Sequence, residues 1–265
     1  MHEDAERPGA QFQVTEQPCL GGEFAVSQGL SSACVLCARR LATVLTDEAP
    51  SAVIATGFEQ RLRLGQVLYT AGRRSDAVFV MRRGLAKEVL DSGYARRVVR
   101  LVGPRSVTGL SALVGEPHRH TAVVIGAGLA CRIPVAALAE WGGRDLRASA
   151  RVGRLWQQAL DDADRLIASY GCGPAAARLA RYVLFLTETV GSGARLCRRE
   201  AAELLGVTPV SVTRLVGDLK RQGLIREQGA SLTAWDSSGL QALAAQGEPG
   251  PRPGVLSEAL AANRR

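Results

Sequence analysis

Six cysteines are the residues of this 265-residue chain with the widest choice of chemistry. Three of them, Cys19, Cys34 and Cys37, lie close to the N-terminus, and the last two form a Cys-Val-Leu-Cys pair. Disulfides are rare in the cytoplasm, where we expect the chain to reside. Metal binding, redox sensing and inert packing in a core therefore remain open for these thiols.

A second set of residues, near the C-terminus, has the pattern of a helix-turn-helix. The segment 199–205 is amphipathic, and Gly206 ends it because glycine adopts a left-handed backbone at little cost. Thr208 is a good N-cap and Pro209 a good first residue for a second helix, predicted over 209–222. Two helices joined by so short a turn are the geometry that enters the major groove of DNA.

The outer face of the second predicted helix carries small polar residues and one arginine, as a base-reading surface requires. Residues 224–233 indicate a hairpin, the wing of a winged helix, and basic residues on either side suit phosphate contacts. A plain helical hairpin is the alternative, but the caps, turn, wing and basic flank together favour DNA binding. The residues expected at the DNA are Arg198, Arg199, Thr208, Pro209, Val210, Ser211, Thr213, Arg214 and Lys220.

The elements that must position these groups follow from apolar periodicity. Residues 58–135 are short apolar or alternating runs punctuated by glycines, which is typical of an antiparallel β-sandwich or barrel. Residues 145–170 predict one long helix with an apolar seam that advances by four and three, as in paired helices. Packing within its own domain is the alternative to dimerisation for this seam. Its members are Val152, Trp156, Ala159, Ala163, Leu166 and Tyr170.

Charge and hydropathy favour a cytoplasmic protein with a polyanionic partner. The net charge is +8, which suits nucleic acid but is also compatible with simple solubility. The N-terminus is polar and no apolar run is long enough to cross a bilayer. The glycine pairs at 126–128 and 191–193 are interpreted as turns, and neither nucleophile–base sets nor paired carboxylates indicate an enzyme.

Taken in order, these elements resemble the Crp/Fnr family of bacterial regulators, over roughly residues 20–240. The most specific match is Gly206-Val-Thr-Pro-Val-Ser-Val-Thr-Arg-Leu215, which is close to the family's recognition segment. The resemblance implies an α+β protein with an antiparallel β-roll sensor, a long dimerisation helix and a C-terminal winged helix-turn-helix. It also implies a homodimer on two-fold symmetric double-stranded DNA, with RNA polymerase as a partner. The domains expected are a cysteine-bearing arm over 1–45, the roll over 46–143, the dimerisation helix over 144–171, the winged helix-turn-helix over 172–242 and a flexible tail over 243–265.

Two departures from the family pattern bear on specificity. Val210 stands where the family has a glutamate that reads cytosine, and valine offers no acceptor, so we expect altered half-sites with Arg214 reading guanine. Cyclic-nucleotide members have a glutamate and an arginine in the roll, where this chain has Thr108-Gly-Leu and His120-Thr-Ala. A buried phosphate without a fixed cation is costly, so cyclic nucleotide binding is not expected.

The Fnr branch of the family implies a redox cofactor. Gly128-Leu-Ala-Cys131 is similar to the roll segment that carries its fourth cysteine ligand, and Cys19, Cys34 and Cys37 would supply the other three. Four thiolates are the ligand set of a [4Fe–4S] cluster. Cys19 stands unusually far from the other two, whereas Cys172 and Cys197 are interpreted as structural.

The resulting hypothesis is a regulator whose dimerisation and DNA binding depend on a cluster that oxygen or nitric oxide degrades. Zinc, a thiol switch, a small-molecule effector, or haem bound through His118 and His120 are the alternatives. An iron–sulfur electron-transfer protein is the alternative of another class, but such a carrier does not need a helix-turn-helix with a basic flank.

Overall fold

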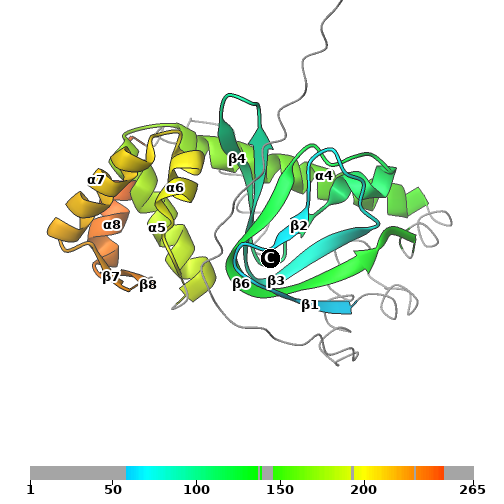
Figure 1. Cartoon of the computed structure of the whole chain (residues 1–265), viewed down its shortest axis with the longest axis horizontal. Coiled ribbons are helices and arrows are strands. Elements are labelled where there is room, and N and C mark those ends of the chain that lie inside the picture. The colour runs from blue at the N-terminus through cyan, green and yellow to red at the C-terminus, as the bar shows by residue number, and fades with distance from the viewer. Residues whose placement is uncertain (1–57, 137, 139–145, 192–193, 230, 248–265) are drawn as a thin grey trace, which may run out of the picture.

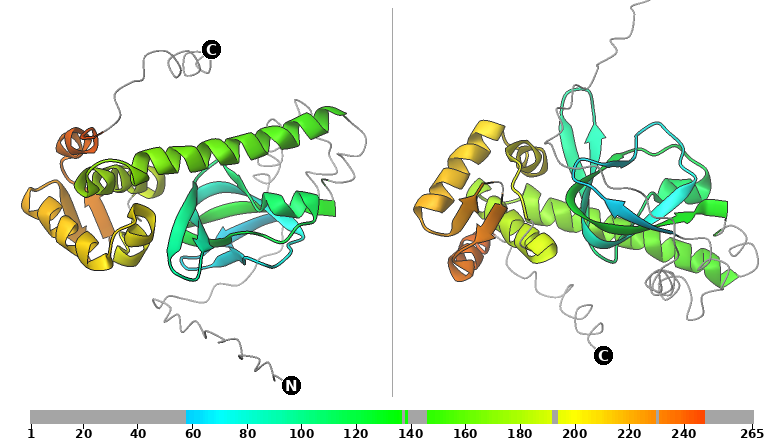
Figure 2. Two further views of the ribbon diagram at one scale, coloured as in Figure 1. Left: turned by 90° about the horizontal axis from the view of Figure 1, so that it is seen from above. Right: turned by 60° about the horizontal axis from the view of Figure 1, so that its bottom comes forward.

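A computed structural model describes residues 58–136, 138, 146–191, 194–229 and 231–247. The predicted arm and most of the predicted tail, with Cys19, Cys34 and Cys37, lie outside these ranges. A β-roll stands at one end of the molecule and a small helical domain at the other (Figure 1). One long helix runs along the roll and reaches the helical domain (Figure 2). The α+β architecture predicted from the sequence is confirmed.

The roll is one antiparallel sheet in the order β1-β6-β3-β4, with β2 paired to β6 and β5 paired to β3. A short 3-10 helix, Leu110–Val114, follows β5. The strands are β1 (Phe58–Leu62), β2 (Val67–Tyr69), β3 (Ala77–Asp91), β4 (Arg96–Val102), β5 (Val107–Thr108) and β6 (Thr121–Pro134).

Strands β3 and β6 are longer than the glycine spacing predicts. Gly84 lies inside β3, and Gly126 and Gly128 lie inside β6, so the interpretation of 126–128 as a turn was wrong. The two strands pair along most of their length, with register shifts near these glycines. Gly84 has φ +85°, and a Cβ there would lie 2.5 Å from the Gly126 carbonyl oxygen. The glycines therefore allow two bent strands to approach closely instead of ending them.

The helical part begins with α4 (Leu146–Leu166), which continues through one π-turn, Ile167–Gly171. The C-terminal helical domain follows, and its last helix extends into the predicted flexible tail as far as Ala244. Its elements are α5 (Ala175–Val190), α6 (Arg198–Leu205), α7 (Pro209–Arg221), β7 (Ile225–Gln228), β8 (Ser231–Ala234) and α8 (Ser237–Ala244).

The apolar core of the helical domain extends into the roll. Leu179, Val183 and Leu205 are fully buried in the same cluster as Leu85 and Val98 of the roll. A separate cluster fills the inside of the roll, and a third lies where α4 covers it. Burial of apolar surface therefore holds the two domains against each other within one chain.

The residues of the predicted dimer seam are partly buried within the chain and partly exposed. Leu166 and Tyr170 are 8% and 7% exposed because they pack into the chain's own helical-domain core. Among the side chains described in α4 and its π-turn, the large apolar ones left exposed are Trp156, Leu160 and Ile167, at 41%, 56% and 61%. These three recur by four and seven and form an exposed stripe on one side of the helix; Trp156 belongs to the seam expected, whereas Leu160 and Ile167 each follow a seam position by one residue. Ala159 and Ala163 are partly buried beside this stripe, and the side chain of Val152 lies outside the described residues.

We expect Gly84→Ala to lower the free energy of unfolding by more than about 1 kcal/mol, because its φ and its neighbours reject a Cβ. The matched control is Gly153→Ala, on the exposed surface of α4, where a Cβ meets nothing within 4 Å. That control should be neutral or stabilise by up to about 1 kcal/mol. Chemical denaturation measures both, and equal effects of the two changes would contradict this account of β3.

Candidate functional site

Local capping determines where the second helix of the helix-turn-helix begins. Gly206 has φ +66° and closes α6, as predicted. The Thr208 side chain accepts a hydrogen bond from the Ser211 amide at 3.1 Å, and Pro209 is the first residue of α7. Val212 and Val216 are buried in the domain core, so the opposite face of α7 points outward.

The outward face of α7 is open to a partner. Val210 is 71% exposed, and Thr213 and Arg214 are also exposed. The Thr213 hydroxyl donates to the Pro209 carbonyl at 3.0 Å, whereas Arg214 makes no ion pair or hydrogen bond with any described residue. An exposed arginine without an intramolecular partner is available for a base or a phosphate.

The flanking cations predicted to meet phosphates are partly neutralised within the chain. Arg198 lies 2.7 Å from a Glu227 carboxylate oxygen, and Lys220 lies 3.3 Å from the other. Arg199 lies 3.5 Å from Glu203 and keeps 71% of its side chain exposed. Glu227 on β7 therefore competes with DNA phosphate for these two cations.

The wing adds a pair that the sequence reasoning missed. The Arg226 guanidinium lies 3.1 Å from the centre of the Trp235 ring, a cation–π contact. Both side chains come from the hairpin β7–β8 and the residue after it. The available sequence signal was a tryptophan, Trp235, shortly after the predicted wing; its side chain is 57% exposed.

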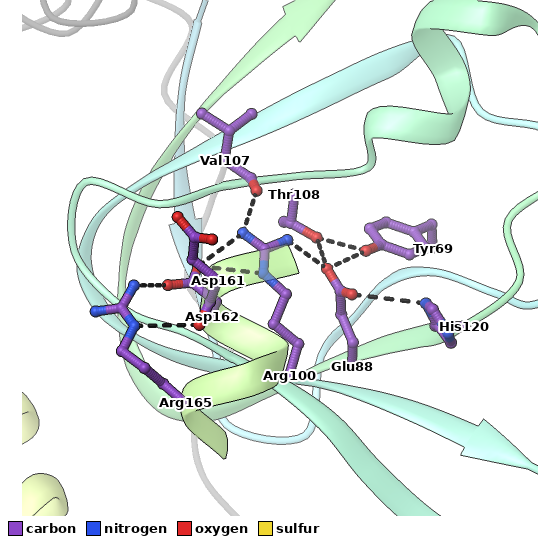
Figure 3. Close-up of polar contacts among 9 residues, drawn as sticks. All are labelled: Tyr69, Glu88, Arg100, Val107, Thr108, His120, Asp161, Asp162 and Arg165. Carbon is purple, nitrogen blue, oxygen red and sulfur yellow. Dashed lines mark hydrogen bonds and ion pairs between the residues drawn. The ribbon is translucent and has the colours of Figure 1, made fainter. Parts of the chain in front are cut away.

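A pocket of about 800 Å³ lies between the roll and α4. Its α4 wall includes Trp156 and Leu160, two residues of the exposed stripe. Glu88 of β3 lies at its base, where Tyr69 and Thr108 each hydrogen bond to its Oε1, at 3.0 and 2.6 Å. Figure 3 shows these groups converging on one carboxylate.

Arg100 of β4 joins this carboxylate to α4. Its Nη1 donates to Glu88 Oε1 at 3.1 Å, and its Nη2 donates to the Val107 carbonyl at 2.8 Å. Its Nε and Nη2 lie 3.3 and 3.2 Å from Asp162 Oδ2. The buried guanidinium therefore bridges three elements and has its donors engaged by protein groups (Figure 3).

Two histidines face the same pocket. His120 Nδ1 lies 3.6 Å from the second oxygen of Glu88. His118 is 3% exposed and stacks on Tyr69 with ring centroids 3.9 Å apart, and its Nε2 has no hydrogen-bond partner among the described residues. Burial lowers the pKa of His118 below its usual value, and the Glu88 charge only partly opposes this. Burial, followed by the charge of Glu88, raises the pKa of the Tyr69 hydroxyl.

This geometry bears on the expected lack of cyclic-nucleotide chemistry. Thr108 and His120, which stand at the two motif positions compared above, both contact Glu88. The carboxylate in the pocket belongs to Glu88 of β3, which lies outside both of those motif segments. Lys87-Glu88, two charges inside an otherwise apolar strand segment, were the signal that could have found it. The guanidinium of Arg100 is already paired, so it offers no uncommitted cation for a phosphate.

Cys131 lies in β6 and is 3% exposed, in the apolar cluster that Leu155 of α4 also enters. Glu59 of β1 pairs directly with Cys131, so the start of β1 lies next to this position of β6. Cys172, which precedes α5 in the chain, and Cys197, which follows it, are both exposed. Across the described ranges, no three His, Cys, Asp or Glu side chains are arranged to hold a metal. Among these same residues, no helix is both long and apolar enough to span a bilayer.

Two family models match the chain: a cyclic nucleotide-binding domain over residues 59–144 and a Crp-like helix-turn-helix domain over residues 177–243. The anaerobic regulatory protein of Haemophilus influenzae is 24% identical over 189 residues, covering 68% of this chain and 73% of that protein. The transcriptional regulatory protein btr of Bordetella pertussis is 26% identical over 195 residues, covering 70% and 81%. A solved CRP-family transcriptional regulator from Thermus thermophilus superposes with a TM-score of 0.59 at 25% identity, covering 71% of this chain and 98% of that one.

A roll of the cyclic-nucleotide-binding type, joined by a long helix to a helix-turn-helix, defines a DNA-binding regulator and not an enzyme. The chain is a transcription regulator of the Crp/Fnr type.

Because His118 is buried, we expect the free energy of unfolding to decrease in mild acid. Its pKa is near 6.5 when unfolded and lower when folded, so its contribution is complete above about pH 6.5. As the pH falls below that value, the unfolded chain binds a proton that the folded chain rejects, and stability decreases until the folded pKa is reached. Thermal unfolding at pH 7.5 and 5.5 should show a smaller decrease for His118→Phe than for the wild type. An equal decrease in the two proteins would refute this role.

Proposed function

We propose that the protein is a homodimeric, sequence-specific regulator whose DNA binding responds to oxygen or nitric oxide through a [4Fe–4S] cluster. In this proposal Cys19, Cys34, Cys37 and Cys131 hold the cluster, and RNA polymerase is the partner at the promoter. The observation that carries it is the burial of Cys131 against α4, the helix whose exposed stripe suits a second copy.

The exposed stripe supports dimerisation through α4. Trp156 and Leu160 of α4 and Ile167 of the π-turn that follows expose large apolar surfaces on one side of the helix. A second α4 from another copy buries such a stripe by lengthwise packing. The symmetric dimer places two copies of α7 at neighbouring major grooves, about 34 Å apart.

The exposed face of α7 supports base reading through Arg214. Its guanidinium can donate two hydrogen bonds to guanine, while Val210 can contact only a methyl group. Arg214→Ala should weaken binding about 10-fold or more to a duplex selected from random sequence on the wild-type protein. The control is Arg61→Ala, an exposed arginine of β1 far from the helix-turn-helix in the sequence, which removes the same charge. Fluorescence anisotropy measures both, and equal losses would assign Arg214 to general electrostatics.

The same selection tests Val210. Val210→Glu restores an acceptor at an exposed position near the start of α7. We expect the variant to select a half-site that differs from the wild-type half-site by a cytosine at one position. Identical selected sequences would show that Val210 does not face a base.

The position of Cys131 beside α4 fits a role as a cluster ligand. Its thiol lies at the boundary between roll and α4, and β1, the first described strand, pairs with β6 at this residue. When bound, a cluster supplies iron that oxygen and nitric oxide attack, with thiolates as its ligands. The chain's own part is mechanical: Cys131 packs in the apolar group that includes Leu155, so a change at the thiol alters the seating of α4. The anaerobic regulatory protein of Haemophilus influenzae, a relative at 24% identity, supports a role in anaerobic regulation.

Purification without air tests the cluster. We expect a brown protein with broad visible absorption and iron and sulfide in equal amounts, which bleaches in air as the dimer weakens. Cys131→Ser should remove the colour, whereas the matched control Cys197→Ser, at an exposed thiol, should retain it. Absorption spectroscopy and sedimentation velocity report both effects. A colourless wild type, or a coloured Cys131→Ser variant, would overturn this ligand assignment.

The pocket supports a second candidate, a regulator controlled by a small molecule. The pocket has a volume of about 800 Å³, which is enough for a small molecule. The buried His118 Nε2 has no hydrogen-bond partner among the described residues, so a ligand could supply one. Trp156 and Leu160 make its α4 wall apolar. A wild-type protein that is colourless and binds DNA equally with and without air would favour this candidate over the cluster.

A further inference from the structure

The hairpin formed by β3 and β4 has two polar faces that serve different neighbours. Adjacent residues of a strand point to opposite sides. Glu88 faces the pocket and, through Arg100, contacts Asp162 of α4. Lys87 faces the other way, toward α6, the first helix of the helix-turn-helix.

Lys87 makes a buried ion pair between the two domains. Its side chain is 6% exposed, and its Nζ lies 2.9 Å from Glu203 Oε2 and 3.7 Å from Glu200 Oε1. A buried lysine needs such partners, because an unpaired ammonium loses its hydration. Burial raises the pKa of Glu200, and the Lys87 charge opposes that rise.

Neighbouring contacts fix the same interface. The Arg97 guanidinium of β4 lies against Gly206, so closely that a Cβ there would clash. Gly206 is the turn residue that closes α6, two residues before the N-cap of α7. Val98 of β4 is buried in the core shared with the helical domain. Figure 1 shows this hairpin standing beside α6.

The hairpin does not mask the DNA-reading face. Val210 is 71% exposed and Arg214 is exposed while the domains are docked. The docked arrangement is therefore compatible with DNA contact. Its physical consequence is orientation, because it holds α7 in one position relative to α4.

We propose that Lys87 is a positioning residue that sets the spacing of the two recognition helices in the dimer. The ion pair with Glu203 docks the helix-turn-helix on the roll, and Arg100 docks the same hairpin on α4. A fixed angle between α4 and α7 fixes the distance between two copies of α7. This inference rests on the proposed dimer on two-fold symmetric DNA.

The test compares whole sites with half-sites. Duplexes selected from random sequence on the wild-type protein supply the probe, which is also made as a single half-site and with the half-sites moved apart or together by one to three base pairs. Lys87→Met keeps much of the buried volume and removes the charge. We expect it to bind the selected whole site at least about fivefold more weakly, a typical coupling between sites. Its half-site affinity should match the wild type, and its preference for one spacing should flatten.

Two controls separate positioning from damage. Arg82→Met breaks an ion pair with Glu59 that lies entirely within the roll, and should keep the wild-type spacing preference. Glu203→Gln should reproduce the flattened profile, and the charge-reversed pair Lys87→Glu with Glu203→Lys should restore it in part. These two variants also keep the test open if Lys87→Met does not fold, which thermal unfolding reveals.

The outcomes distinguish this inference from the proposed function. A wild type that is monomeric, or that selects no symmetric site, removes the proposed function itself. A wild type with a strict spacing preference that Lys87→Met and Glu203→Gln both retain overturns only the positioning role. Equal losses on half-sites and whole sites also overturn it, because they indicate a damaged reading domain.

Discussion

The arrangement of this regulator depends on one buried cation. Arg100 is 5% exposed and contacts the pocket carboxylate of Glu88, the β5 backbone at Val107 and Asp162 of α4. A guanidinium removed from water needs charged and hydrogen-bonding partners, and Arg100 finds them on these three elements together. The position of α4 on the roll is therefore coupled to the polar contents of the pocket.

The same two strands connect the pocket with the DNA-reading domain. Glu88 and Lys87 are neighbours in β3, yet one contacts the sensor interior and the other contacts α6. Around them the apolar core continues from the roll into the helical domain through Leu85 and Val98. Anything that changes the pocket or the seating of α4 acts on strands that also hold the helix-turn-helix. The sensor and the reader are thus joined by packing and charge as well as by the chain between them.

Prediction from sequence was most successful where the signals are local. Thr208 and Pro209 begin α7 as expected, and Gly206 takes the left-handed conformation that the turn requires. Prediction failed where a residue's role depends on distant partners. Gly126 was predicted to lie in a turn, but it lies within β6 against Gly84 of β3. Leu166 was predicted to lie in the dimer seam, but it packs in the core of the helical domain.

The sequence by itself determined the class of protein, because helix caps, turn glycines and apolar periods act within a few residues of each other. It also placed Arg214 on the outer face of the second helix, where the structure leaves it exposed. Only the tertiary structure decided that Glu88 supplies the pocket carboxylate, that Glu227 neutralises predicted phosphate contacts, and that Leu160 marks the open face of α4. These outcomes depend on pairs far apart in the chain, such as Arg100 with Asp162, whose proximity exists only after the domains have packed.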